Sequence, residues 1–187
     1  MSRWAPDAAL RLENAAVDLF EKQGYGPTTV PQIAARAGLT TRTFFRHFAD
    51  KREVLFLRDR EFPDVVGAAL TGLPGDLGPS ELVERALASA VEPLERWREA
   101  IGRRRTLIQT DDRLKERELL KSARLSEAVA SALSTRGLAP LDARLLAAMA
   151  VSVFDVALDG WLDSADGTTL ADHLAVVWDR MRAVHSA

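Results

Sequence analysis

The segment TVPQIAARAGLTTRTFFRHF, residues 29–48, has the pattern of two short helices joined by a tight turn. Thr29 and Gln32 have the spacing of a capping box, in which each side chain accepts a backbone N–H at the start of a helix. Gly38 falls where the chain must turn sharply, and glycine adopts a positive φ without steric cost. Thr40 has the residue type and the position of an N-cap for the second helix. The segment therefore predicts a helix-turn-helix.

The second of these helices has two distinct faces. Phe44 and Phe48 are four residues apart, so they lie on one side and are expected to pack inward. The other side carries Thr41, Arg42, Phe45 and Arg46. An apolar stripe that fixes the helix and an outer face of hydrogen-bond donors are what a major-groove recognition helix needs. An ordinary helical hairpin with a polar surface shows the same pattern, so the pattern alone leaves that alternative open.

The charge is unevenly distributed along the 187 residues, although the net charge is only −2. Residues 1–60 contain ten Lys and Arg against seven Asp and Glu, a net charge of +3. The remainder contains fifteen against twenty, a net charge of −5. A basic first third on an acidic body suits a nucleic-acid-binding head, although an imbalance of this size also arises by chance.

The composition excludes several classes of protein. The chain has no cysteine, which rules out a disulfide framework and a thiolate metal or redox site. No uninterrupted apolar run reaches the roughly 18 residues of a membrane span, and the first ten residues lack the apolar region of a signal peptide. We therefore expect a soluble, cytoplasmic protein with no membrane partner.

Helical periodicity extends over almost the whole chain, and no segment has a convincing strand pattern. A helix is expected from Asp50, and Pro63 should kink or end it. The glycine- and proline-rich stretch Thr71–Pro79 is the clearest loop. Further helices are expected from Ser80 to about Ile101, in two segments between Arg103 and Thr135, from Pro140 to about Leu162, and over roughly Thr169–Val184. The fold class is all-α.

The N-terminal third resembles the TetR (tetracycline-repressor) family of bacterial regulators. The matching residues are Phe20, Gly24, Thr28–Val30, Ile33–Ala34, Ala37–Thr40, Thr43–Phe45, His47–Phe48 and Lys51. The resemblance implies an N-terminal three-helix helix-turn-helix DNA-binding domain, residues 1–60. It also implies a C-terminal helical bundle for ligand binding and dimerisation, residues 61–187.

The resemblance also implies roles for single residues. Phosphate contacts are expected from Thr29, Thr40, Thr43, His47 and Lys51, and base contacts from Thr41, Arg42 and Thr43. Phe45 departs from the tyrosine frequent at this position and cannot donate to a phosphate, although it can pack against a sugar or a thymine methyl. Arg46 adds a charge that can compensate, and Gln32 completes the predicted DNA-binding set.

A homodimer held by the last two helices is a further implication of the resemblance. The helix beginning at Pro140 carries two apolar stripes, one of which includes Val151, Phe154 and Leu158, the predicted interface. The other includes Met149 and Val156. A helix that is apolar on more than one face must be covered on more than one side. A monomer core would also cover it, so that alternative stays open.

The family also implies an inducer, here predicted to be an apolar or amphipathic small molecule bound within the body. The candidate lining residues are Trp97, Phe154, Trp161 and Trp178, with Arg104 of the Arg103–Arg105 triplet as an anchor for an anionic group. Aromatic residues at helical spacing are more often plain core, and an arginine triplet is more often a solvated helix terminus. No cofactor is expected, and neither His173 nor His185 has neighbours at metal-ligand spacing.

The sequence therefore predicts a sequence-specific DNA-binding transcriptional regulator, a repressor released from a near-palindromic operator by a small molecule. An enzyme is the second alternative, but the chain has no Gly-rich phosphate loop, nucleophile elbow or metal motif. A helical adaptor that no longer binds DNA is the third, and intact Thr40, Arg42, His47 and Lys51 argue against it.

Overall fold

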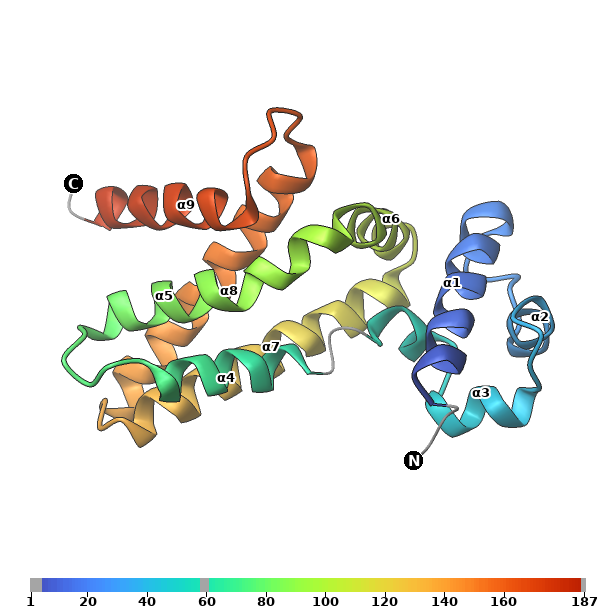
Figure 1. The fold of residues 1–187 in the computed structure, drawn as a ribbon, viewed down its shortest axis with the longest axis horizontal. Helices are drawn as coiled ribbons and strands as arrows, with labels where there is room; N and C mark the ends of the chain where they lie inside the picture. The colour runs from blue at the N-terminus through green and yellow to red at the C-terminus, as the bar shows by residue number, and fades with distance from the viewer. Residues whose placement is uncertain (1–4, 58–60, 186–187) are drawn as a thin grey trace. The chain divides into compact units, whose positions relative to one another are not determined.

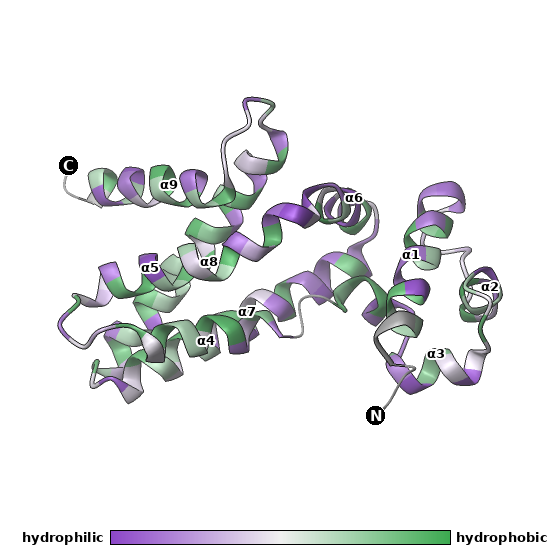
Figure 2. Cartoon of the chain, viewed as in Figure 1, coloured by the Kyte–Doolittle hydropathy of each residue, from purple (hydrophilic) through white to green (hydrophobic). Residues whose placement is uncertain are grey.

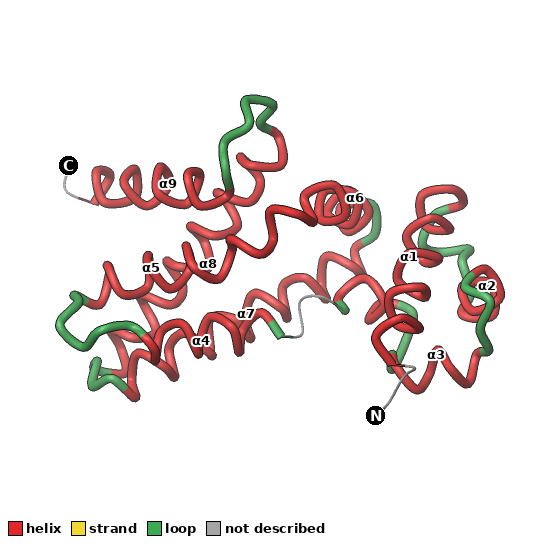
Figure 3. Tube along the Cα trace, viewed as in Figure 1, coloured by secondary structure: helices red, strands yellow, loops and turns green. Residues whose placement is uncertain are grey.

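The structure is a computed structural model that describes residues 5–57 and 61–185. Over these residues the chain is helical and contains no strand, which confirms the predicted all-α class (Figures 1 and 3). The α-helices are α1 (Ala5–Gln23), α2 (Val30–Arg36), α3 (Thr41–His47), α4 (Phe62–Gly72), α5 (Pro79–Val91), α6 (Arg98–Gln109), α7 (Asp112–Thr135), α8 (Pro140–Asp163) and α9 (Leu170–His185). Two 3₁₀ helices, η1 (Arg52–Phe56) and η2 (Glu92–Trp97), lie between them.

Contacts divide the chain into two compact units. The first contains residues 1–60 together with residues 99–119, and the second contains residues 61–98 and 120–187. Most of α6 and the start of α7 group with the N-terminal unit, which therefore extends beyond residue 60. The reason is burial, because Leu107, Ile108 and Leu114 lie in the core of that unit.

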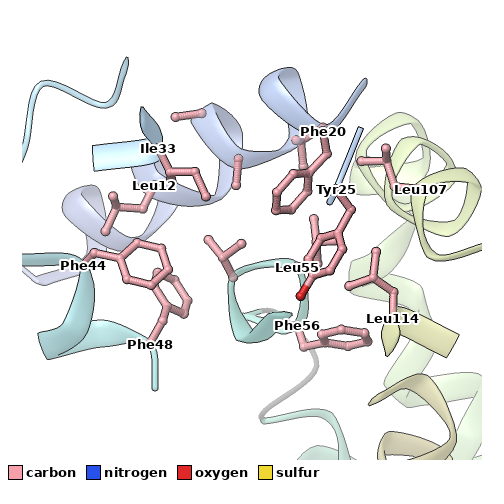
Figure 4. Packing of buried hydrophobic residues seen from close by; sticks show 14 of the residues in the cluster. Leu12, Phe20, Tyr25, Ile33, Phe44, Phe48, Leu55, Phe56, Leu107 and Leu114 are labelled. Carbon is pink, nitrogen blue, oxygen red and sulfur yellow. The ribbon is translucent and has the colours of Figure 1, made fainter. Parts of the chain in front are cut away.

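The core of the first unit is built around α1, which contributes Leu12 and Phe20 (Figure 4). Ile33 of α2 and the rings of Phe44 and Phe48 pack against it, and η1 adds Val54, Leu55 and Phe56. The ring centroids of Phe44 and Phe48 are 5.3 Å apart. These residues are almost completely removed from water, so burial of apolar surface holds the short helices α2 and α3 on α1.

The segment after α3 corrects one prediction. Asp50 does not begin a long helix; its carboxylate accepts the N–H groups of Arg52 at 2.7 Å and Glu53 at 3.2 Å and starts the short η1. Pro63 does not kink or end a helix but lies in the first turn of α4. Proline is suited to that position, because first-turn N–H groups have no helical partner.

The second unit packs α5, α8 and α9 together, with α4 against α5. Trp161 and Trp178 are each only 1% exposed in its interior. Arg98 lies over the Trp161 ring and donates to the carbonyl oxygens of Trp161 and Ser164, where α8 ends. Arg136 donates to the carbonyl oxygens of Leu70, Leu73 and Pro74, which fixes the loop after α4. The Gly- and Pro-rich segment is therefore a loop from Leu73 to Gly78, shorter than predicted.

Helix α8 is long and apolar enough, by length and composition, to cross a membrane. Its inner residues, including Ala147, Val153 and Ala157, are buried within the second unit. The apolar character of α8 is therefore partly that of a core helix, and the rest lies on exposed residues. The average hydropathy of α8 is high, although Asp and Arg side chains interrupt each apolar run.

Candidate nucleic-acid interface

Both helices of the motif begin with the predicted side-chain caps. The N–H of Thr29 donates to Gln32 Oε1 at 2.8 Å, and the N–H of Gln32 donates to Thr29 Oγ1 at 3.4 Å. At the start of α3, the N–H of Thr43 donates to Thr40 Oγ1 at 3.1 Å. These bonds satisfy N–H groups that lack helical partners, so both helix starts are defined by local sequence.

The turn between α2 and α3 depends on Gly38, whose φ is +66°. A residue with a side chain would be strained at this φ, and its Cβ would lie 3.0 Å from Nη2 of Arg11. The same guanidinium of Arg11 donates to the carbonyl oxygen of Ala37. The N–H of Leu39 donates to the carbonyl oxygen of Ala34 at 2.8 Å. Together these contacts fix the direction in which α3 leaves the turn.

Helix α3 presents the two faces that the sequence predicts. Phe44 and Phe48 are 0% and 1% exposed, whereas Phe45 is 58% exposed. Thr41, Arg42 and Arg46 are also exposed. The helix is thus fixed from one side and offers guanidinium and hydroxyl donors from the other. Of the predicted DNA-binding residues, Thr29 and Gln32 lie exposed at the start of α2, and Thr40 is exposed beside α3.

Some of the predicted phosphate donors already have partners. The hydroxyl groups of Thr40 and Thr43 are 3.0 Å apart and share a hydrogen bond. Nη2 of Arg46 lies 3.5 Å from Nε2 of His47. The threonine pair keeps one O–H donor for a phosphate, because only one of the two hydroxyls donates to the other, and a guanidinium carries five N–H donors. They therefore remain compatible with a backbone contact.

Lys51 contacts the loop before α2. Its ammonium donates to the carbonyl oxygens of Tyr25 and Thr28, each at 2.6 Å, and to that of Gly26 at 3.2 Å. It also lies 4.1 Å from the centre of the Tyr25 ring. An ammonium has three N–H bonds, and three carbonyls accept from it. Lys51 therefore holds the loop before α2, and in this structure its three N–H bonds are directed to carbonyl oxygens.

Ion pairs connect α1 with both α2 and α6, and the sequence gives no sign of them. Asp18 lies 2.7 Å from a guanidinium nitrogen of Arg36 and 3.1 Å from one of Arg103. Arg103 also makes a two-bond contact with Glu21 at 2.8 and 2.6 Å. Hydrogen bonds from Arg36 and then Arg103 lower the pKa of Asp18, and the bond from Arg103 lowers that of Glu21.

The predicted ligand-pocket residues do not form one group. Phe154, Trp161 and Trp178 are buried in the second unit, where Phe154 packs on Phe62 with ring centroids 5.2 Å apart. Trp97, at the end of η2, also belongs to that unit. Arg104 is 7% exposed and belongs to the first unit. The Arg103–Arg105 triplet is therefore not a solvated helix terminus, although α6 is largely hydrophilic (Figure 2). The grooves described in the second unit are lined by other residues.

Two of the three predicted dimer residues are also corrected, whereas the third, Val151, is half-buried. Phe154 and Leu158 are 4% and 2% exposed, because they face the interior of the second unit. The large apolar residues that α8 and α9 expose are Leu141, Leu145, Met149, Val156, Val176 and Val184. Part of this surface forms a groove of 610 Å³ between the two helices, lined by Met149, Val156, Val176, Arg180 and Val184 among others.

The N-terminal unit of this all-α chain carries a capped helix-turn-helix. The apolar inner face of α3 is packed in the core, and its outer face is polar. This is the arrangement of a helix-turn-helix protein of the DNA-binding type. Residues 13–56 match the sequence profile of the bacterial regulatory proteins of the tetR family. This part of the chain therefore carries the helix-turn-helix segment of the tetR family.

Two of the matching relatives each align with 81 residues of the chain. The transcriptional regulator TcmR of Streptomyces glaucescens is 37% identical over 81 residues, which are 43% of this chain and 36% of that protein. A transcriptional repressor of Mycobacterium tuberculosis is 33% identical over 81 residues, 43% of this chain and 41% of that protein. The matched segments thus span less than half the length of these relatives.

Solved structures share the fold along nearly the whole chain. The complex of SmeT with triclosan has a TM-score of 0.66 and 19% identity, and covers 95% of this chain and 90% of that one. SmeT is the repressor of a multidrug efflux pump of Stenotrophomonas maltophilia. FadR of Bacillus subtilis in complex with stearoyl-CoA has a TM-score of 0.60 and 16% identity, and covers 91% and 95%. At these identities the likeness concerns the fold alone.

Proposed function

We propose that this protein is a sequence-specific DNA-binding transcriptional regulator that acts in the cytoplasm. The observation that carries the proposal is the exposed face of α3, which presents Thr41, Arg42 and Arg46 while Phe44 and Phe48 fix its inner face. Arg42 stands in the first turn of α3, where recognition helices contact base edges. The matched relatives are named as regulators, which supports the proposal over an enzyme.

The regulator acts as a homodimer through the exposed faces of α8 and α9. An apolar groove of this kind on an isolated chain marks an interaction surface. Val176 and Val184, 68% and 70% exposed, would be removed from water by a partner. A dimer with twofold symmetry presents two copies of α3 and therefore binds a near-palindromic operator.

Repression relieved by an apolar or amphipathic small molecule is the mode of action that we propose. The support is the shared fold with SmeT and FadR, whose structures contain triclosan and stearoyl-CoA. A ligand releases DNA only to the extent that it binds the released state more tightly than the DNA-bound state. Linkage then requires that operator DNA weaken ligand binding by the same factor.

The test is binding of the purified protein to the promoter of its own gene, measured by fluorescence anisotropy at fixed salt. We expect tighter binding to this fragment than to random DNA of equal length, by at least about 10³-fold. Equal affinity for both DNAs would contradict a sequence-specific regulator. Light scattering at micromolar concentration should show a dimer, and a monomer would contradict the assembly. Thermal shift with fatty acyl and aromatic compounds tests the ligand.

A further inference from the structure

The exposed apolar stripe on α8 extends beyond the groove that lies between α8 and α9. Leu141, Leu145, Ala148, Ser152 and Val156 are all exposed and are spaced three or four residues apart. At 1.5 Å per residue the stripe is about 22 Å long. Its C-terminal half lines the α8/α9 groove defined above, and its N-terminal half lines a second groove of 530 Å³ between α7 and α8. Ala148 lines both grooves.

The α8/α9 groove carries one basic side chain, whereas the α7/α8 groove carries one acidic and one basic side chain. Arg180 lines the α8/α9 groove and Glu127 lines the α7/α8 groove, and both are exposed. Glu127 shares its groove with Arg144. Within the described part of the chain, neither Arg180 nor Glu127 forms an ion pair. Each groove thus has an apolar floor and a charge that a partner surface can meet.

We propose that the twofold axis of the homodimer passes beside Ala148, so that the α7/α8 groove of one protomer covers the α8/α9 groove of its partner. In a twofold interface, residue i contacts residue j and j contacts i. The exposed stripe is symmetric about the point between Ala148 and Met149. This register brings Leu141 to the partner's Val156 and Leu145 to the partner's Ser152.

The same register brings Glu127 to the partner's Arg180, and symmetry forms this pair twice. The small side chain of Ala148 lets the two copies of α8 approach closely where they cross. The pair then helps to set the register, because opposite charges that meet across an interface favour one alignment over others. This register rests on the proposed homodimer. The experiments below give different results for a wrong register and for the absence of a dimer.

The first test is a cross-link at the axis. The natural chain has no cysteine, so Ala148→Cys introduces a single thiol. A disulfide needs Cα atoms within about 7 Å, which only residues near the axis satisfy with their own copy. We expect mild oxidation to give a covalent dimer of Ala148→Cys on a non-reducing gel. Val156→Cys is the matched control and should stay uncross-linked, because it lies about 12 Å along α8 from the axis.

Cross-linking of Val156→Cys but not of Ala148→Cys would overturn the register and leave the homodimer intact. A wild-type protein that is monomeric by light scattering would instead contradict the homodimer itself. Operator binding by reduced Ala148→Cys checks that the variant keeps its fold.

The second test reverses the charges. Glu127→Arg and Arg180→Glu should each weaken the dimer by about tenfold, since every dimer contains the contact twice. The double variant should recover to within about threefold of the wild type, as a coupled pair requires. Arg124→Glu is the control on the same helix, because Arg124 is exposed and lines neither groove. A double variant as weak as the single variants would overturn the pairing.

Discussion

Substitution of Lys51 by methionine separates a structural role from a DNA contact. Lys51→Met keeps most of the apolar stem and removes an ammonium that donates to three carbonyl oxygens. A hydrogen bond from a charged group contributes about 1.5–3 kcal/mol when buried, and the bonds to Tyr25 and Thr28 are only partly buried. Burial lowers the pKa of the ammonium, and this desolvation cost offsets part of the gain. We therefore expect a net loss of about 2 kcal/mol in the free energy of unfolding.

The loss is measured by urea unfolding, where a slope of about 1–3 kcal/mol per molar predicts a midpoint shift of roughly 1 M. Lys22→Met is the matched control, since Lys22 is exposed on α1, and it should change stability by less than about 0.5 kcal/mol. For operator binding by folded Lys51→Met, the log–log salt slope should equal that of the wild type. A slope smaller by about 1, with an unchanged urea midpoint, would refute this reasoning and make Lys51 a phosphate contact.

Three further outcomes are expected. Arg42→Ala should cost about 1–3 kcal/mol on the operator and relax specificity at one base pair; equal weakening on random DNA would make Arg42 a phosphate contact. Gly38→Ala should lower thermal stability by about 1–2 kcal/mol, because alanine is strained at φ +66°, and an unchanged melting temperature would contradict this. The lowered pKa values of Asp18 and Glu21 stabilise the fold above the ordinary carboxyl range near about 4, and this contribution is lost as pH falls through the lowered values. Urea titrations at several pH values should therefore show that acid destabilises wild type more than Arg103→Gln, by less than about 1 kcal/mol for such exposed pairs, and identical pH profiles would contradict it.

Several features of the candidate site could be predicted because they depend on neighbouring residues. The caps at Thr29 and Thr40, the positive φ of Gly38 and the two faces of α3 all arise within one or two turns of chain. Backbone N–H groups at a helix start need a partner wherever the helix lies. Because a helix has 3.6 residues per turn, the adjacent residues Phe44 and Phe45 point to different faces in any helix.

Contacts between distant segments could not be predicted in this way. The sequence alone does not show that Lys51 would reach carbonyls 23 to 26 residues away, or that Leu107 and Ile108 would join the core of the N-terminal unit. On α8 the pattern revealed two apolar stripes but not which one faces inward. Periodicity records which residues share a face, whereas the neighbour that covers each face is determined by packing between elements far apart in sequence. Only the tertiary structure therefore buried Phe154 and Leu158 and left Val156 exposed.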